Sequence, residues 1–136
     1  MNAAEPFFDT NVLLYLLSAD AAKADRVEEL LAGGGTISVQ VLNEFASVSL
    51  RRLRTSVADL REILAPVRTV CRVEPILEDT HDRALNVTER YGFSIYDSLI
   101  VASALRAGCA RLYSEDLQHG QVVDRQLRIV NPFRAA

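Results

Sequence analysis

Short apolar runs alternate along the chain with longer stretches in which apolar residues recur every three or four positions. The short runs predict strands at 6–8, 36–39, 70–73, 111–114 and 127–130. The stretches with helical spacing predict helices at 12–17, 21–32, 41–50, 57–65, 78–91 and 95–107. The helix at 95–107 is apolar almost all round, which predicts that it is buried.

Residues that typically begin or end helices lie between these elements and support the same division. Asp20 is placed to cap the helix at 21–32, and Gly92 and Gly108 follow the last two helices. Pro66 is expected to end the helix at 57–65, because proline lacks the backbone N–H that a helix interior requires. Alternation of strands and helices predicts an α/β sandwich with a mainly parallel central sheet of four or five short strands. No repeat or linker interrupts the pattern, so we expect one domain over residues 1–136.

Composition places the chain among globular proteins. At 136 residues and 49% hydrophobic content, it is long enough to bury a core. The longest apolar run, at 12–17, is too short to span a bilayer, and the N-terminal residues lack the basic start and apolar stretch of a signal peptide. We therefore expect a cytoplasmic protein with no membrane segment. Cys71 and Cys109 are expected to be buried thiols rather than zinc ligands.

The charge pattern gives mixed indications about a nucleic-acid partner. The formal net charge of −3 argues weakly against one, since proteins that bind phosphate tend to be basic. Fourteen of the fifteen basic residues are arginine, whose fork suits phosphate, although a GC-rich coding bias gives the same skew and is the reading we favour. Arg51, Arg52 and Arg54 form a cluster for which phosphate binding and an ordinary solvated face are about equally good interpretations.

Four acidic residues could converge on one edge of the sheet, where ligands gather in parallel α/β proteins: Asp9, Glu44, Asp97 and Asp116. Asp9 and Asp116 follow predicted strands, Glu44 lies one to two turns into the helix after the 36–39 strand, and Asp97 lies at the start of the 95–107 helix. Each also has a structural interpretation: Asp97 as a helix cap or a charge that faces the helix dipole, Asp116 as a turn residue and Glu44 as an exposed helix position. Asp9 is the hardest to explain in this way, because a carboxylate that follows two phenylalanines is costly to bury without a partner.

No lysine or arginine is adjacent in sequence to Asp9, Asp97 or Asp116. Carboxylates about 4 Å apart repel by several kcal/mol at an intermediate dielectric, and a divalent cation relieves that repulsion. All-oxygen ligands select magnesium or manganese, which suits attack of water on a phosphodiester. His81 and His119 are too scattered for a histidine site and are expected on the surface.

Polar residues next to these acids have two possible roles. Thr10, Asn11 and Ser38 are placed either to contact water on such a metal or to serve as helix caps and turn residues.

Four segments, at 8–13, 41–45, 96–104 and 112–120, resemble the ordered motifs of PIN-domain nucleases. They read Phe-Asp-Thr-Asn-Val-Leu, Val-Leu-Asn-Glu-Phe, Tyr-Asp-Ser-Leu-Ile-Val-Ala-Ser-Ala and Leu-Tyr-Ser-Glu-Asp-Leu-Gln-His-Gly. The closing segment 129–133 looks like the end of VapC-type toxins of VapBC toxin–antitoxin systems. Each motif alone is weak, but four in the family's order carry the resemblance across nearly the whole chain.

This resemblance implies a three-layer α/β/α sandwich and RNA cleavage that depends on Mg²⁺ or Mn²⁺. It also implies a VapB-like antitoxin partner, which could use the arginine cluster, and a homodimer. The implied catalytic residues are Asp9, Glu44, Asp97 and Asp116; the implied metal ligands are Asp9, Asp97 and Asp116; Thr10, Asn11 and Ser114 are the implied polar support. Two questions stay open: whether Asp116 or the adjacent Glu115 faces the site, and whether Asp124, the only nearby candidate for a further acid, joins it.

Two other enzyme classes and one non-enzymatic class compete with this interpretation. An aspartate-nucleophile phosphatase is disfavoured because Asn11 stands where its second aspartate belongs and the only lysine, Lys23, lies on an early helix. A P-loop nucleotidase is disfavoured because the glycines at 33–35 lack a following lysine. A PIN-like module that binds without catalysis remains the principal alternative.

Overall fold

A six-stranded sheet forms the centre of the molecule, and the computed structural model describes residues 5–134. The strands are β1 (Phe7–Phe8), β2 (Gly35–Ser38), β3 (Cys71–Glu74), β4 (Arg111–Tyr113), β5 (Val122–Val123) and β6 (Leu127–Val130). The helices are α1 (Thr10–Leu14), the 3₁₀ turn η1 (Tyr15–Leu17), α2 (Ala21–Ala32), α3 (Val39–Arg51), α4 (Val57–Val70), α5 (Glu78–Tyr91) and α6 (Ile95–Arg106).

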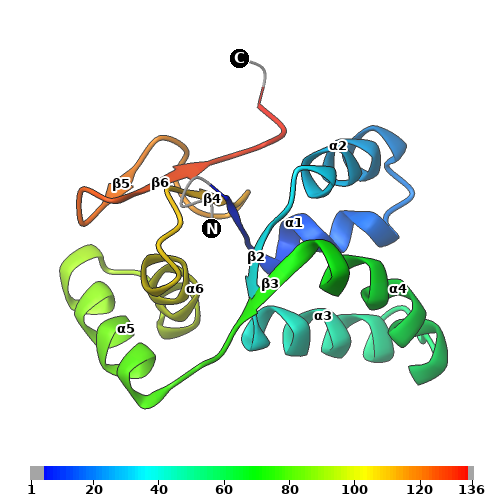
Figure 1. The fold of residues 1–136 in the computed structure, drawn as a ribbon, viewed down its shortest axis with the longest axis horizontal. Coiled ribbons are helices and arrows are strands. Elements are labelled where there is room, and N and C mark those ends of the chain that lie inside the picture. The colour runs from blue at the N-terminus through cyan, green and yellow to red at the C-terminus, as the bar shows by residue number, and fades with distance from the viewer. Residues whose placement is uncertain (1–4, 135–136) are drawn as a thin grey trace.

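The helices cover both faces of this sheet. Helices α1 to α4 lie on one side, and α5 and α6 lie on the other (Figure 1). The predicted α/β/α sandwich with a mainly parallel sheet is therefore confirmed. The predicted burial of the 95–107 helix is also confirmed, since α6 buries residues on every side, including Ser98, Ile100, Val101 and Leu105.

The strand order is β3-β2-β1-β4-β6-β5, and every neighbouring pair is parallel except β5 with β6. The chain builds outward from β1 through β2 to β3, and then crosses to the other side of β1 to add β4. This reversal puts helices on opposite faces and opens a crevice beyond the carboxyl ends of β1 and its neighbours, which is where α/β proteins bind ligands. Asp9 and Ser114 directly follow β1 and β4 at this edge.

Close packing around β1 fixes that edge. Phe7 and Phe8 are completely buried, and the ring of Phe8 lies so close to Gly35 that a Cβ there would come within 2.4 Å of it. Glycine is thus required at the start of β2 for steric reasons, because any side chain would displace an aromatic ring of the core.

The predicted end of the helix at Pro66 was wrong. Helix α4 continues through Pro66 to Val70. The missing N–H of Pro66 deprives the Glu62 carbonyl of its helical partner, but both residues are exposed and water can serve that carbonyl. Beyond the proline, Val67 is only 3% exposed, and its burial outweighs the local cost.

The predicted number of strands was also too low, because β5 was missed. Val123 and Gln126 enclose a tight turn in which Asp124 and Arg125 both have positive φ, as in the primed turns of two-residue hairpins. These turns usually carry asparagine and glycine, so the sequence Asp-Arg gave no hairpin signal. The first helix likewise begins earlier than predicted, at Thr10, because Asp9 caps it.

Two smaller predictions concern single residues. Cys71 and Cys109 are buried free thiols, as predicted, and burial raises the pKa of Cys71 to about 11. His81 and His119 are exposed, again as predicted. Within residues 5–134, no helix combines the length and apolar character needed to cross a membrane.

Candidate active site

An acidic cleft of about 360 Å³ lies at the carboxyl edge of the sheet. Its lining includes all four predicted acids, Asp9, Glu44, Asp97 and Asp116. They come from the end of β1, the middle of α3, the first turn of α6 and the loop after β4. The fold therefore brings together carboxylates that are up to 107 positions apart in the chain, between Asp9 and Asp116.

Asp9 is the deepest of the four, with 6% of its surface exposed. Its Oδ1 accepts a hydrogen bond from the Thr10 N–H (2.7 Å), and its Oδ2 accepts one from the Ser114 hydroxyl (2.9 Å). Burial raises its pKa to about 6; the two hydrogen bonds oppose that shift, and the charges of Asp97 and Asp116 add to it. The carboxylate is thus held firmly in a position that disfavours its own charge.

Asp97 does not cap its helix. The N-cap of α6 is Ser94, whose hydroxyl accepts a hydrogen bond from the Asp97 N–H at 3.2 Å. Asp97 lies in the first turn, half-buried, where the helix dipole favours a negative charge. The capping interpretation of this residue is therefore wrong, and its carboxylate lines the cleft.

Glu44 is connected to the β1 end through Thr10. The Thr10 hydroxyl donates a hydrogen bond to Glu44 Oε1 (2.6 Å), and the Gln40 amide donates one to Glu44 Oε2 (3.3 Å). Glu44 is half-buried rather than on the solvated face of α3. Both of its oxygens are oriented by the protein.

Asp116 and Glu115 point to different surroundings. Asn11 donates a hydrogen bond from its side-chain amide to Asp116 Oδ2, and Asp116 lines the cleft. Burial, together with the charges of Asp97 and Glu115, raises the pKa of Asp116.

Glu115 is engaged outside the cleft. It forms an ion pair with Lys23 (2.6 Å) and accepts a hydrogen bond from the Tyr15 hydroxyl. Lys23 also lies over the rings of Tyr15 and Phe133, 4.5 and 4.9 Å from their centres. The pKa of Glu115 is lowered by these hydrogen bonds. Because Lys23 and Tyr15 hold Glu115, it is Asp116 that faces the cleft.

The two serines predicted as polar support have different surroundings. Ser114 is completely buried between the Asp9 carboxylate and the Leu117 N–H, which donates to its hydroxyl at 3.2 Å. Ser38 is also buried, but its hydroxyl caps α3 by accepting from the Val41 N–H, and it does not line the cleft. Of its two predicted roles, the structure shows the helix cap.

The arginine cluster reaches the cleft through one member only. Arg52, at the C-cap of α3, lines the cleft beside Ser47 and Val48, whereas Arg51 and Arg54 do not. In the described part of the chain, no salt bridge joins any of the four acids to an arginine or lysine. The cleft is therefore acidic at its centre with one cation in its wall.

Asp124, the other acid considered, is remote from this chemistry. Its Oδ1 accepts a hydrogen bond from the Tyr91 hydroxyl (2.8 Å) and forms an ion pair with Arg90, whose Nη1 is 3.6 Å away. It lines a different hollow, beside α5.

The donor set of the cleft fits a hard divalent cation. Asp9, Asp97 and Asp116 offer carboxylate oxygens from three elements, and Mg²⁺ prefers oxygen ligands. Between residues 5 and 134, no group of three or more acidic, histidine or cysteine side chains is arranged so that it could hold a metal ion by itself. The arrangement matches the usual binding of Mg²⁺ in open sites, through one or two carboxylates with water and substrate phosphate completing the shell.

Sequence reasoning missed two residues with polar side chains in the cleft wall, Ser47 and Tyr96, and it missed Gln40, which contacts Glu44 from outside that lining. Gln40 precedes Glu44 by one helical turn, so its contact with that carboxylate was readable from an i, i+4 spacing. Ser47 and Tyr96 line the cleft. The position of Tyr96 depends on how α3 and α6 pack, which no local pattern reveals.

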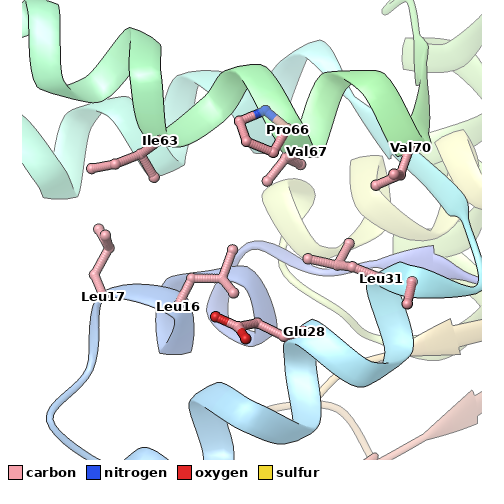
Figure 2. Close-up of a pocket in the computed structure, with 9 residues that line it drawn as sticks. Leu16, Leu17, Glu28, Leu31, Ile63, Pro66, Val67 and Val70 are labelled. Carbon is pink, nitrogen blue, oxygen red and sulfur yellow. The ribbon is translucent and has the colours of Figure 1, made fainter.

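A second hollow has quite different chemistry. It lies between η1, α2 and α4, and Leu16, Leu17, Leu31, Ile63 and Val67 point into it, with Glu28 as its one charged residue (Figure 2). It offers no converging carboxylates or hydrogen-bond donors for a reaction. The acidic cleft is accordingly the candidate active site.

The raised pKa of Asp9 predicts a specific pH dependence of stability. The folded protein binds a proton that the unfolded chain releases between about pH 4 and pH 6, so this carboxyl's contribution to the unfolding free energy falls as pH rises through that window. With chelator present, Asp9→Asn should therefore become more stable than the wild type above pH 6, by on the order of 2–3 kcal/mol. Urea unfolding from pH 4 to pH 8 measures this difference.

The control is Asp25→Asn, which removes an acid from the exposed face of α2 and should give no gain in that window. A constant loss of stability in Asp9→Asn at every pH would show instead that the helix cap and the Ser114 contact dominate.

Comparisons with known proteins identify the family of this chain. A family model for the PIN domain matches residues 7–124. Among solved structures, the chain is similar to Mycobacterium tuberculosis VapC20, a Sarcin-Ricin loop cleaving toxin, with 27% identity and a TM-score of 0.65 over 82% of this chain and 90% of that one. It also shares its fold with a chain of a toxin–antitoxin complex from Klebsiella pneumoniae, with 17% identity and a TM-score of 0.71 over 96% and 100% of the two chains. No curated protein matches the sequence. Because the family model covers most of its length, this chain belongs to the PIN domain family.

Proposed function

We propose that this protein is a metal-dependent endoribonuclease that acts as the toxin of a toxin–antitoxin pair. The observation that carries the proposal is the convergence of Asp9, Glu44, Asp97 and Asp116 on one cleft without a salt bridge to balance them. A structural role for these acids would call for cationic partners, since uncompensated like charges cost stability. A nuclease gains from the same arrangement, because a cation and a phosphate complete it.

Asp9, Asp97 and Asp116 are the residues that would hold Mg²⁺ or Mn²⁺. When bound, the ion supplies neutralisation of the phosphodiester charge and activation of water. The protein fixes the ligands beforehand: Ser114 and the Thr10 N–H hold Asp9, and Asn11 holds Asp116. Such pre-orientation lowers the cost of organising the site when substrate arrives.

Glu44 would orient the attacking water. Its carboxylate is fixed by Thr10 on one side and Gln40 on the other, and it lines the same cleft as Asp9 and Asp97. Water attacks phosphorus and releases one proton, the bond from phosphorus to one sugar oxygen breaks, and the departing oxygen takes up one proton, so the protons balance. No covalent bond to the protein is needed in this scheme.

Arg52 would contact a substrate phosphate at the rim of the cleft. It is the member of the arginine cluster that lines the cleft, and its fork suits bidentate phosphate contacts. Arg51 and Arg54 are exposed outside the cleft, where RNA further along the strand or antitoxin carboxylates can reach them.

The toxin role rests on the two structural neighbours. One is a toxin that cleaves the Sarcin-Ricin loop and the other belongs to a toxin–antitoxin complex. From these we extend to this chain an RNA substrate and a VapB-like antitoxin partner. The homodimeric state and the cytoplasmic location remain predictions from the sequence and its family resemblance.

Removing one carboxylate tests the proposed reaction. Asp97→Asn should reduce metal-dependent RNA cleavage by at least about a hundredfold, as expected when a group that stabilises transition-state charge is removed. The helix should survive, because Ser94 provides its cap. Cleavage of a mixed RNA pool by the wild type, Asp97→Asn and the control Asp25→Asn, each with Mn²⁺ and with chelator, measures the effect.

Equal cleavage by Asp97→Asn and the wild type would reject this site. Absence of cleavage by a folded wild type that nevertheless binds RNA would favour a catalytically silent binding module.

Substitution of two neighbouring arginines, Arg52 and Arg51, tests the proposed phosphate contact. Arg52→Ala should weaken RNA binding and reduce the slope of log K against log salt by about 0.7, the value for one phosphate contact on a single strand. Arg51→Ala removes the same charge from an adjacent position outside the cleft and should change the slope less. Fluorescence titrations at several salt concentrations measure both, and equal effects would return Arg52 to a general electrostatic role.

A further inference from the structure

Tyr96 is an unusual feature of the cleft wall. It directly precedes Asp97 in the first turn of α6, yet 65% of its surface is exposed. Large aromatic side chains gain stability from burial, so a mostly exposed ring beside an active-site candidate leaves a face available to a ligand.

The backbone beneath this ring is firmly held. The amide of Gln40 donates hydrogen bonds to the Tyr96 carbonyl oxygen (3.1 Å) and to Glu44 Oε2 (3.3 Å). One side chain of α3 therefore ties the base of the tyrosine to a cleft carboxylate. The ring sits on a fixed helical turn at a constant place relative to Glu44.

Another hollow, largely apolar and of about 480 Å³, adjoins the acidic cleft. It is distinct from the hollow between η1, α2 and α4. Glu44, Ser47 and Tyr96 line both, so the two hollows form one continuous surface with Tyr96 at the boundary. The apolar residues that line this adjoining hollow include Val39, Ile76 and Leu99. Val39 and Ile76 are 39% and 37% exposed. Its chemistry suits a flat, uncharged group that arrives together with the phosphate.

We propose that Tyr96 and this adjoining hollow bind an unpaired nucleobase next to the scissile phosphate. The inference rests on the proposed function and adds a base-binding position to the proposed active site. A phosphate at the carboxylates would place the neighbouring base within reach of Tyr96, where the ring offers a face for stacking. A base inside a duplex has both faces covered by its neighbours, so the position is tested with an unstructured RNA.

The test pairs two substitutions with two kinds of substrate. Tyr96→Ala removes the ring, and Tyr96→Phe keeps it. The substrates are one unstructured RNA oligonucleotide that the wild type cleaves and versions of it with an abasic nucleotide at each position flanking the cleavage point. Tyr96→Ala should lower kcat/KM on the intact RNA by about fivefold to a hundredfold, the range for loss of one base–aromatic stack. Tyr96→Phe should stay within about twofold of the wild type.

The abasic substrates separate stacking from a structural effect. At one flanking position the abasic nucleotide should slow the wild type and abolish the difference between wild type and Tyr96→Ala. The same oligonucleotides, bound to proteins that also carry Asp97→Asn, should give matching changes in Kd without cleavage.

Three results would overturn the inference. The first is unchanged activity of Tyr96→Ala on the intact RNA. The second is an equal loss at every abasic position. The third is a loss that follows a change in sedimentation, which would assign the ring to a contact between copies of the chain. If the folded wild type cleaves no RNA, both the proposed function and this inference fail. If the wild type cleaves RNA but the Tyr96 variants behave like it, only the inference about Tyr96 fails and the proposed nuclease function stands.

Discussion

Mutual repulsion among carboxylates is the constraint on which this structure depends. Asp9 is buried where its charge is disfavoured, and Asp97 and Asp116 raise its pKa further. The free energy that holds these groups together comes from elsewhere, chiefly from the buried strand β1 and from α6, which is buried on several sides. The rigid scaffold thus holds the carboxylates close together despite their repulsion, and a bound cation would reduce that repulsion.

Three consecutive residues transmit this arrangement across the cleft. Asp9 contacts Ser114 beyond β4, Thr10 contacts Glu44 on α3, and Asn11 contacts Asp116 in the loop after β4. Because these residues form the cap and first turn of α1, a single short helix positions Asp9 relative to acids from two other segments, Glu44 on α3 and Asp116 after β4. The ion pair of Glu115 with Lys23 completes the set by leaving Asp116 as the acid that faces the cleft.

Much of this was readable from the sequence, for a physical reason. Asp9 and Asp116 follow predicted strands and Glu44 lies on the helix after another strand, and parallel strands bring their carboxyl ends to one edge, so these three acids could be placed together from the sequence. Asp97 follows a helix and not a strand, so its place in the set depended on its position at the start of the 95–107 helix. The sequence could not separate Asp116 from Glu115, because their distinction depends on Lys23, 92 residues away. The continuation of α4 past Pro66 depends on the burial of Val67. The position of Tyr96 in the cleft wall depends on the packing of α6 against α3. Each of these is a tertiary effect that no local pattern encodes.

Calorimetric titration of the protein with Mn²⁺ asks whether the cleft carboxylates share a divalent cation. We expect weak binding near pH 7.5 that is lost in both Asp9→Asn and Asp97→Asn, retained in Asp124→Asn, and weakened as pH falls below the raised pKa of Asp9, about 6. Equal Mn²⁺ affinity in the wild type and in the two cleft variants would show that these carboxylates do not share the ion.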